Sequence, residues 1–134
     1  MCGIVGYWSP KAECQAHIVR DMAQRITHRG PDAEGVWLDQ AAGLALGHRR
    51  LSILDLSPAG AQPMVSIDDR LVLVFNGEIY NHRSLRVEVE AAGWDGGWRG
   101  HSDTETLLAA LQLWGVQRTL SRLNGMFAFA LWDR

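Results

Sequence analysis

The chain has 134 residues, of which 47% are hydrophobic and 21% charged, and its formal net charge is −2 at pH 7. This length and balance are typical of a single soluble globular domain. The sequence contains no basic patch of the kind that binds nucleic acid, and no apolar run approaches the roughly 18 residues of a membrane span. We therefore expect neither a nucleic-acid partner nor a membrane protein.

The N-terminus has neither the basic region nor the apolar core of a signal peptide. The two cysteines, Cys2 and Cys14, are too few to form a disulfide framework. We therefore expect a cytoplasmic protein in which both thiols are free.

In chain order, hydrophobic patterning predicts a mixture of strands and helices. The predicted strands cover residues 3–8, 35–39, 42–54, 70–81 and 125–134. The predicted helices cover residues 12–28, 82–92, 102–114 and 117–123, with a loop at 57–64 and a glycine-rich break at 93–100. Because the helices do not alternate regularly with single strands, we expect an α+β fold rather than a doubly wound parallel sheet.

Three local signals refine this prediction. Asn76-Gly77 ends the most apolar strand segment, and this dipeptide favours a tight turn. Ser102 is followed three residues later by Glu105, which is the spacing of a helix capping box. Cys14 falls inside the first predicted helix, where we expect an ordinary helix residue.

Cys2 directly follows the initiator methionine and precedes an apolar strand. A thiol attacks as the thiolate, and a free cysteine with a pKa of about 8.5 is only a few per cent thiolate at neutral pH. Once Met1 is removed, the α-amine of Cys2, with an ordinary pKa of about 7.7–8.0, could accept the thiol proton. Cys2 is therefore a candidate N-terminal nucleophile, although a cysteine at position 2 is a weak signal by itself.

Four other segments carry candidate site residues, and each also has an ordinary structural explanation. The side-chain amide and backbone N–H of Asn76-Gly77 could form an oxyanion hole, or only a turn. Arg49 and Arg50 face opposite sides of a strand, so one could bind a carboxylate while both could also be surface charges. Asp103 could bind an ammonium group, or only complement a helix dipole. Residues 28–32 (HRGPD) could close over a pocket, or only end a helix.

Five motifs occur together in one order, and their combination is far more specific than any one of them. The motifs are MCGIVGYW at 1–8, HRGPDAEG at 28–35, GHRRLSILDLSPAGAQPM at 47–64, FNGEIYN at 75–81 and HSDTE at 101–105. Together they resemble the N-terminal glutaminase domain of class II glutamine amidotransferases over essentially the whole chain. HRGPD and HRRLSILDLS resemble the glutamine-hydrolysing asparagine synthetase family rather than the hexosamine-phosphate synthesising amidotransferases.

This resemblance implies an N-terminal nucleophile hydrolase fold, which is a four-layer sandwich of two antiparallel β-sheets between layers of helices. The family's glutaminase domain continues well beyond FAFALWDR with further strands. The resemblance therefore implies that residues 1–134 are a partial glutaminase domain, incomplete at the C-terminus.

The resemblance also implies a role for each site residue. The implied glutamine-binding residues are Arg50, Leu51, Ser52, Ile53, Asn76, Gly77, Glu78 and Asp103. Cys2, freed of Met1, would attack the side-chain amide of L-glutamine, and Asn76-Gly77 would hold the oxyanion. Arg50 would bind the α-carboxylate of glutamine and Asp103 its α-ammonium. Water would then hydrolyse the γ-glutamyl thioester, releasing glutamate.

In full-length relatives the ammonia crosses a channel to an ATP-dependent synthetase domain, which makes asparagine. The Ser-Gly-Gly pyrophosphate loop of that domain does not occur here, so ATP and Mg²⁺ are expected only in the missing domain and no cofactor or metal in this chain. The implied partners are L-glutamine and a synthetase domain, in the same chain or a separate one, and the full-length protein could be a homodimer. Residues 93–100 form a longer Trp- and Gly-rich loop than in relatives, which leaves the placement of Asp103 open.

Alternatives to a glutaminase follow from the same residues. The chain could be a catalytically inactive remnant that acts only by association. It could be an N-terminal nucleophile hydrolase for another amide, although Arg50 and Asp103 suit a substrate with free α-groups. A Cys–His protease could use His48 or His101 as base, but the spacing singles out neither. A zinc site lacks a closely spaced pair of ligands.

Overall fold

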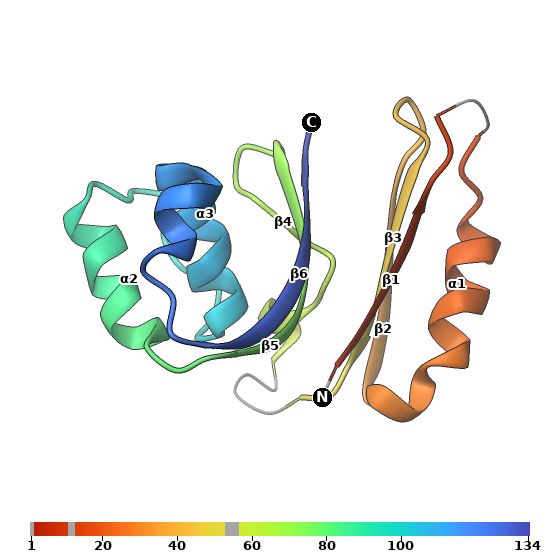
Figure 1. Cartoon of the computed structure of the whole chain (residues 1–134), viewed down its shortest axis with the longest axis horizontal. Coiled ribbons are helices and arrows are strands. Elements are labelled where there is room, and N and C mark those ends of the chain that lie inside the picture. The colour runs from red at the N-terminus through yellow and green to blue at the C-terminus, as the bar shows by residue number, and fades with distance from the viewer. Residues whose placement is uncertain (1, 11–12, 53–56) are drawn as a thin grey trace.

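Two three-stranded antiparallel sheets form the centre of the molecule in the computed structural model, which describes residues 2–10, 13–52 and 57–134. The first sheet has the order β1-β3-β2 and consists of β1 (Gly3–Trp8), β2 (Ala33–Asp39) and β3 (Leu44–Arg50). The second sheet has the order β4-β5-β6 and consists of β4 (Met64–Val65), β5 (Leu71–Ile79) and β6 (Gly125–Asp133). The two sheets lie face to face (Figure 1).

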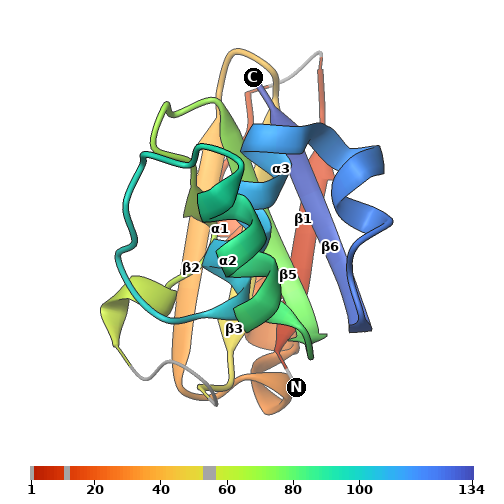
Figure 2. The ribbon, with the colours of Figure 1, turned by 90° about the vertical axis from the view of Figure 1, so that its left-hand side faces the viewer.

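Helices cover the outer face of each sheet. The α-helices are α1 (Ala16–Arg25), α2 (His82–Ala91) and α3 (Asp103–Leu120). Short 3₁₀ helices lie at Thr27–Arg29 and Pro58–Gly60. Helix α1 packs on the first sheet, while α2 and α3 lie over the second (Figure 1). Figure 2 shows the molecule from the side of α2 and α3. The expected α+β fold with two antiparallel sheets is therefore confirmed.

Strand β5 explains how the second sheet is covered on both faces. Its side chains alternate between the two faces, so Leu71, Leu73 and Phe75 join the core under α3, which includes Leu107 and Leu111. Val72 and Val74 face the other way and pack with Leu46 of β3 between the sheets. The continuous apolar run that predicted this strand is thus the run expected of a strand buried on both faces.

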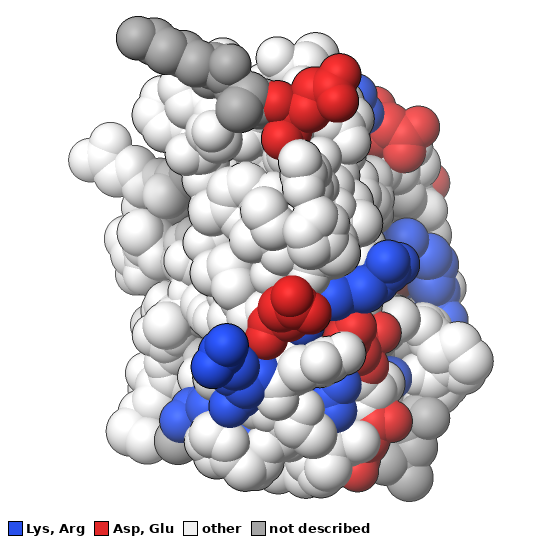
Figure 3. All heavy atoms as spheres, turned by 90° about the vertical axis from the view of Figure 1, so that its right-hand side faces the viewer, with Lys and Arg blue, Asp and Glu red and all other residues white. Residues whose placement is uncertain are grey.

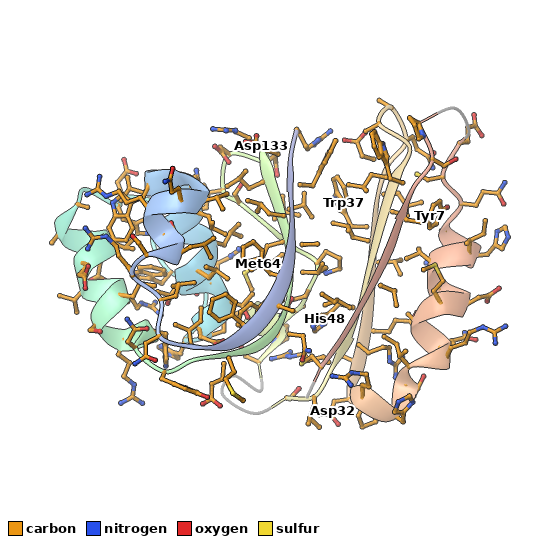
Figure 4. The ribbon with its side chains drawn as sticks, viewed as in Figure 1. Tyr7, Asp32, Trp37, His48, Met64 and Asp133 are labelled. Atoms are coloured by element: carbon orange, nitrogen blue, oxygen red, sulfur yellow. The ribbon has the colours of Figure 1, made fainter. Side chains whose placement is uncertain are left out.

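His48 is a titratable side chain that is fully buried between the sheets, with 1% of its surface exposed. Figure 4 shows it in the space between the sheets, and its Nε2 lies 3.1 Å from the backbone oxygen of Phe75 in β5. Burial disfavours the charged imidazolium and lowers the pKa of His48 from 6.5 to about 4. His48 therefore links the two sheets as a neutral imidazole at neutral pH.

The first predicted helix begins later than expected. The apolar spacing predicts a helix over residues 12–28, whereas α1 starts at Ala16 and ends at Arg25. The prediction that Cys14 is a helix residue is wrong, because Cys14 precedes α1 and is buried against the first sheet with Val19 and Ala45. Its Sγ lies 3.4 Å from the backbone oxygen of Leu44, so this thiol is held by the β2–β3 connection rather than by a helix.

Helix α3 confirms one half of the predicted capping box. The Ser102 side chain accepts a hydrogen bond of 3.1 Å from the Glu105 N–H and so caps the helix. The Glu105 carboxylate does not return to Ser102. It accepts the N–H groups of Arg99 and Gly100 at 2.6 and 3.0 Å, because the preceding loop brings these donors closer. Non-helical Gly115 separates the two predicted helical stretches of α3.

The surface outside α1 carries charges of both signs. Figure 3 shows arginine and acidic side chains interspersed on this face, with no large area of one sign among the residues described. The described parts of the chain also contain no helix that combines the length and the apolar character required to cross a membrane.

We predict that His48→Gln reduces the loss of stability on acidification. Because the folded pKa of His48 is about 4 and its ordinary value is 6.5, the unfolded chain binds the proton more readily in this window, and stability falls as the pH falls through it. The full effect of this shift is about 3 kcal/mol. Glutamine retains a donor for the Phe75 oxygen but does not titrate.

The measurement is the free energy of unfolding in urea at about pH 7 and about pH 4.5, for wild type and variant. The wild type should lose more stability than the variant on acidification. The same substitution at His17, an exposed residue of α1, is the control. Equal losses in wild type and His48→Gln would contradict the prediction.

Candidate functional site

One pocket gathers most of the predicted site residues from four different parts of the chain. It has a volume of about 830 Å³ including its open mouth. The predicted residues that line it are Cys2, Arg50, Leu51, Asn76, Gly77, Glu78 and Asp103. They come from the start of β1, the end of β3, the end of β5 and the first turn of α3.

Of the other two predicted residues, one is not part of this lining and one is not described. Ser52 lies beside the site, but its backbone N–H donates to the Asp32 carboxylate at 2.7 Å and it does not line the pocket. Ile53 lies outside the described residues, as does the end of the predicted strand 42–54. Strand β3 in fact ends at Arg50, because the chain turns there toward Cys2 and Asp32.

Cys2 is held against the chain that leaves β3. Its Sγ accepts the Leu51 N–H at 3.4 Å and lies 3.6 Å from the Leu51 oxygen. The Cys2 oxygen accepts a hydrogen bond of 3.1 Å from Arg29 Nε. The antiparallel pairing of Gly3 with Arg49 sets this arrangement, since it places the residue before β1 beside the residues after β3. The partly buried thiol therefore has a fixed position at the pocket wall.

The two adjacent arginines of β3 have different environments, as the alternation of a strand requires. Arg49 is buried, forms an ion pair of 2.9 Å with Glu34 and donates to the Gly30 oxygen at 2.9 Å. Arg50 lines the pocket and donates one N–H to the Ser57 oxygen at 2.9 Å. Arg49 is therefore a structural residue, while Arg50 presents a guanidinium near Cys2.

Residues 28–32 support the site without closing over it. None of them lines the pocket. Asp32, labelled in Figure 4, donates its N–H to the Arg50 oxygen at 3.0 Å and accepts the Ser52 N–H. This segment holds the chain that carries Arg50 and Leu51 on its path past Cys2.

Asn76-Gly77 is not the predicted tight turn. Strand β5 continues through it to Ile79, and Asn76 and Gly77 pair with Ala128 and Phe127 of β6. Gly77 has a φ of 158°, and a Cβ there would overlap Met126 O and approach Phe127 Cα to 2.5 Å. Only glycine fits, so this residue lets β6 approach closely while its own backbone lines the pocket.

The Asn76 side chain has an unusual hydrogen-bonding state. Its Oδ1 is buried and has no hydrogen-bond partner among the residues that the structure describes. An unpartnered buried amide oxygen is costly, and it indicates that a polar partner belongs beside it. Asn76 lines the pocket together with Cys2, so a hydrogen-bond donor of a bound molecule could supply this partner for Oδ1.

Asp103 is buried at the N-terminus of α3, with 6% of its surface exposed. One carboxylate oxygen accepts the Ile79 N–H at 2.9 Å and the other accepts the Thr104 N–H at 2.8 Å. A carboxylate has about four lone-pair positions, so these two bonds leave further acceptor capacity on Asp103. Asp103 therefore adds negative charge to the side of the pocket contributed by α3 and positions that side against β5.

The Trp- and Gly-rich loop at 93–100 leaves Asp103 at the start of α3. Glu105 binds two backbone N–H groups of the loop, and Arg86 donates to the Gly100 oxygen at 3.0 Å while its guanidinium lies 3.8 Å from the centre of the Trp98 ring. The loop is thus attached to both α2 and α3, and Ser102 still caps α3.

Sequence reasoning missed several pocket residues. They are Gly60, Gln62, Phe75, Tyr80, Ser102, Thr104 and Met126. Gln62 and Thr104 are polar and buried, and both lie within the motifs that carry the resemblance. Their position in those motifs was the available signal, but nothing in the spacing predicted that their side chains meet.

The structure gives no support for a Cys–His pair or a metal centre. Neither His48 nor His101 lines the pocket, and the His48 Nε2 is engaged with Phe75 O. Within the part of the chain that is described, no group of three or more His, Cys, Asp or Glu side chains could hold a metal ion. The pocket instead combines a thiol with a cationic side and an anionic side.

Comparison with known proteins gives the family. A family model described as "Glutamine amidotransferase domain" matches residues 1–134. "Asparagine synthetase [glutamine-hydrolyzing] 1" of Bacillus subtilis (strain 168) is 42% identical over 138 residues, covering 100% of this chain and 21% of that protein. "Asparagine synthetase B [glutamine-hydrolyzing]" of Escherichia coli (strain K12) is 41% identical over 135 residues, covering 99% of this chain and 23% of that protein.

The chain therefore spans about a fifth of the length of these relatives. A solved structure of glutamine phosphoribosylpyrophosphate amidotransferase from B. subtilis, complexed with ADP and GMP, has a TM-score of 0.78 and 21% identity. That match covers 97% of this chain and 35% of the other and shows that the fold is shared. The chain thus belongs to the class II glutamine amidotransferase domain family and is homologous to part of the asparagine synthetases.

Proposed function

We propose that this domain hydrolyses the side-chain amide of L-glutamine, with Cys2 as the nucleophile after removal of Met1. The observation that carries the proposal is the convergence of Cys2, Arg50, Asn76-Gly77 and Asp103 from separate elements on one pocket. This set contains a nucleophile, oxyanion donors and a pair of opposite charges for the two α-groups of an amino acid.

Recognition of glutamine follows from the charges on the two sides of the pocket. The planar guanidinium of Arg50 suits the α-carboxylate, because it can donate two parallel N–H bonds to the two oxygens. The buried Asp103 carboxylate suits the α-ammonium. A substrate whose α-groups are blocked by acylation or a peptide bond loses one or both of these contacts, which favours free glutamine over other amides.

The reaction needs a base, an oxyanion hole and a water molecule. The α-amine of Cys2 takes the thiol proton while sulfur forms a bond to the amide carbon, and the Asn76 amide and Gly77 N–H stabilise the oxyanion. The tetrahedral intermediate collapses, the C–N bond breaks, and the proton passes from the α-ammonium to the leaving nitrogen to give ammonia. Water then adds to the γ-glutamyl thioester, which breaks the C–S bond and gives glutamate.

We further propose that the ammonia serves a synthetase domain, in the same chain or a separate one. The support is the homology to asparagine synthetases, of which this chain matches about a fifth. ATP and Mg²⁺ would act in that other domain, and the chemistry proposed for the residues described here needs neither. The final ammonia acceptor is then a property of the synthetase domain.

We predict that a chloroketone analogue of glutamine alkylates Cys2. The analogue places an electrophilic carbon at the position of the amide, and the sulfur of Cys2 displaces chloride from it. The mass of the protein therefore rises by the mass of the reagent minus that of HCl. Intact mass spectrometry measures the adduct and also shows whether Met1 is present. We expect a single adduct on chains that lack Met1, and protection by excess L-glutamine.

Cys2→Ser and Cys14→Ser are the matched variants, because the chain has two cysteines and Cys14 is buried away from the pocket. Labelling should be lost in the first variant and retained in the second. A folded, Met1-free wild type that stays unlabelled would overturn the proposal and favour an inactive remnant. Hydrolysis of acylated substrates but not of glutamine would assign the site to another amide.

We predict that Arg50→Met raises the KM for glutamine by about tenfold to a hundredfold, because one charge-assisted interaction of about 1.5–3 kcal/mol is lost. The kcat should change less, since the α-carboxylate is bound in both the ground state and the transition state. Release of glutamate measures both constants.

Arg83→Met, at an exposed position of α2, is the matched control for loss of an arginine charge. It should leave both constants near the wild-type values. An unchanged KM in Arg50→Met would show that Arg50 does not bind the substrate carboxylate.

A further inference from the structure

We propose that Gln62 and Thr104 are positioning residues that hold the oxyanion-forming segment of β5 against the first turn of α3. The proposal rests on the proposed glutamine hydrolysis, and it concerns how the two sides of that same pocket are kept in register. Both side chains are buried and both line the pocket, yet they reach each other from distant segments of the chain.

The bridge consists of two hydrogen bonds through one side-chain amide. Gln62 Oε1 accepts the backbone N–H of Phe75 at 2.6 Å, and Gln62 Nε2 donates to Thr104 Oγ1 at 3.4 Å. Phe75 directly precedes Asn76, and Thr104 directly follows Asp103. The amide of Gln62 therefore connects the neighbour of the oxyanion donor to the neighbour of the proposed ammonium-binding residue.

A second hydrogen bond completes the support at the other end of the segment. Ile79 donates its N–H to Asp103 Oδ2 at 2.9 Å. Phe75 and Ile79 thus bracket the pocket residues 76–78, and both are attached to the first turn of α3, one through Gln62 and Thr104 and one directly through Asp103. The segment between them has little freedom to move relative to α3.

Gln62 is itself held in place by the neighbouring strands. Met64 of β4 pairs with Leu73 of β5, so the antiparallel register brings Gln62 opposite Phe75. Gly35 of β2 lies so close to the Gln62 backbone oxygen that a Cβ would overlap it. The first sheet therefore contacts the backbone of Gln62. The side chain of Gln62 extends away from this contact to β5 and α3.

Both polar groups of Phe75 are engaged by side chains from other elements. Its N–H donates to Gln62, and its C=O lies 3.1 Å from His48 Nε2. The C=O of Phe75 belongs to the same peptide unit as the N–H of Asn76, so its orientation sets the path into residues 76–78. Oxyanion donors act only when they are held where the negative charge develops. Loss of the bridge should therefore impair the chemical step more than substrate binding.

The test compares Thr104→Val, Thr104→Ser and Gln62→Met with Thr106→Val. Valine keeps the shape of threonine but removes the hydroxyl that Gln62 Nε2 reaches, whereas serine keeps this hydroxyl. We expect Thr104→Val and Gln62→Met to lower kcat about tenfold with a much smaller change in KM, because small misplacements of reacting groups slow the chemical step. Thr104→Ser should restore most of the lost kcat.

Thr106→Val is the matched control in the same helix. Thr106 is also fully buried and its hydroxyl donates to Ser102 O at 3.3 Å, but it does not line the pocket. It should lose a similar free energy of unfolding with little change in kcat. Equal kcat values for Thr104→Val and Thr106→Val would overturn the proposal, as would a Thr104→Ser variant no more active than Thr104→Val. A raised KM with unchanged kcat would instead assign Thr104 to substrate binding.

Amide hydrogen exchange provides a readout that does not depend on glutamine hydrolysis. The N–H groups of residues 75–79 should exchange faster in Thr104→Val than in wild type and Thr106→Val. If the wild type releases no glutamate from glutamine, the proposed function fails, but this exchange comparison still decides whether the bridge holds the segment. Unchanged exchange at residues 75–79 in Thr104→Val would overturn the bridge itself.

Discussion

The buried carboxylate of Asp103 joins the start of α3 to the end of β5, and both of these elements border the pocket. It lies at the N-terminus of α3, where the helix dipole and the Thr104 N–H stabilise negative charge, and it also accepts the Ile79 N–H of β5. A buried charge of this kind is retained only when it is well hydrogen bonded. The Ile79 N–H belongs to β5 and the Thr104 N–H to α3. The Asp103 carboxylate therefore fixes the start of α3 relative to the end of β5, and residues of both elements line the pocket.

The register of the paired strands also determines which residues meet at the pocket. The pairing of Gly3 with Arg49 brings Cys2 beside Leu51, and the pairing of Gly77 with Phe127 forces a glycine into the strand that borders the pocket. Each sheet thus contributes one side of the site through its register rather than through a flexible loop. A slip of one residue in either pairing would turn these side chains to the opposite face and separate Cys2 from Asn76 and Gly77.

The sequence predicts the order of the elements and most of the residues that converge on the pocket, because burial periodicity and motif order are local properties. The errors arise where distant contacts override a local preference. Asn76-Gly77 has the composition of a turn, but pairing with β6 keeps it extended. Glu105 has the spacing of a capping box, but the loop N–H groups of Arg99 and Gly100 take its carboxylate. The contact between Gln62 and Thr104 links residues 42 positions apart, which no local pattern reveals.

The polar residues of the pocket differ in how much the fold depends on them. Asp103 and Gln62 each accept a backbone N–H of β5, so their removal leaves a buried donor unpaired as well as altering the pocket. Arg50 instead donates to the Ser57 oxygen at the exposed side of the site. Under the proposed glutamine hydrolysis, substitution of Asp103 should therefore combine structural and binding effects, whereas substitution of Arg50 or removal of the Thr104 hydroxyl should report more directly on recognition and positioning. The pocket can therefore be held firmly by Asp103 and Gln62 and still keep polar groups for a bound molecule.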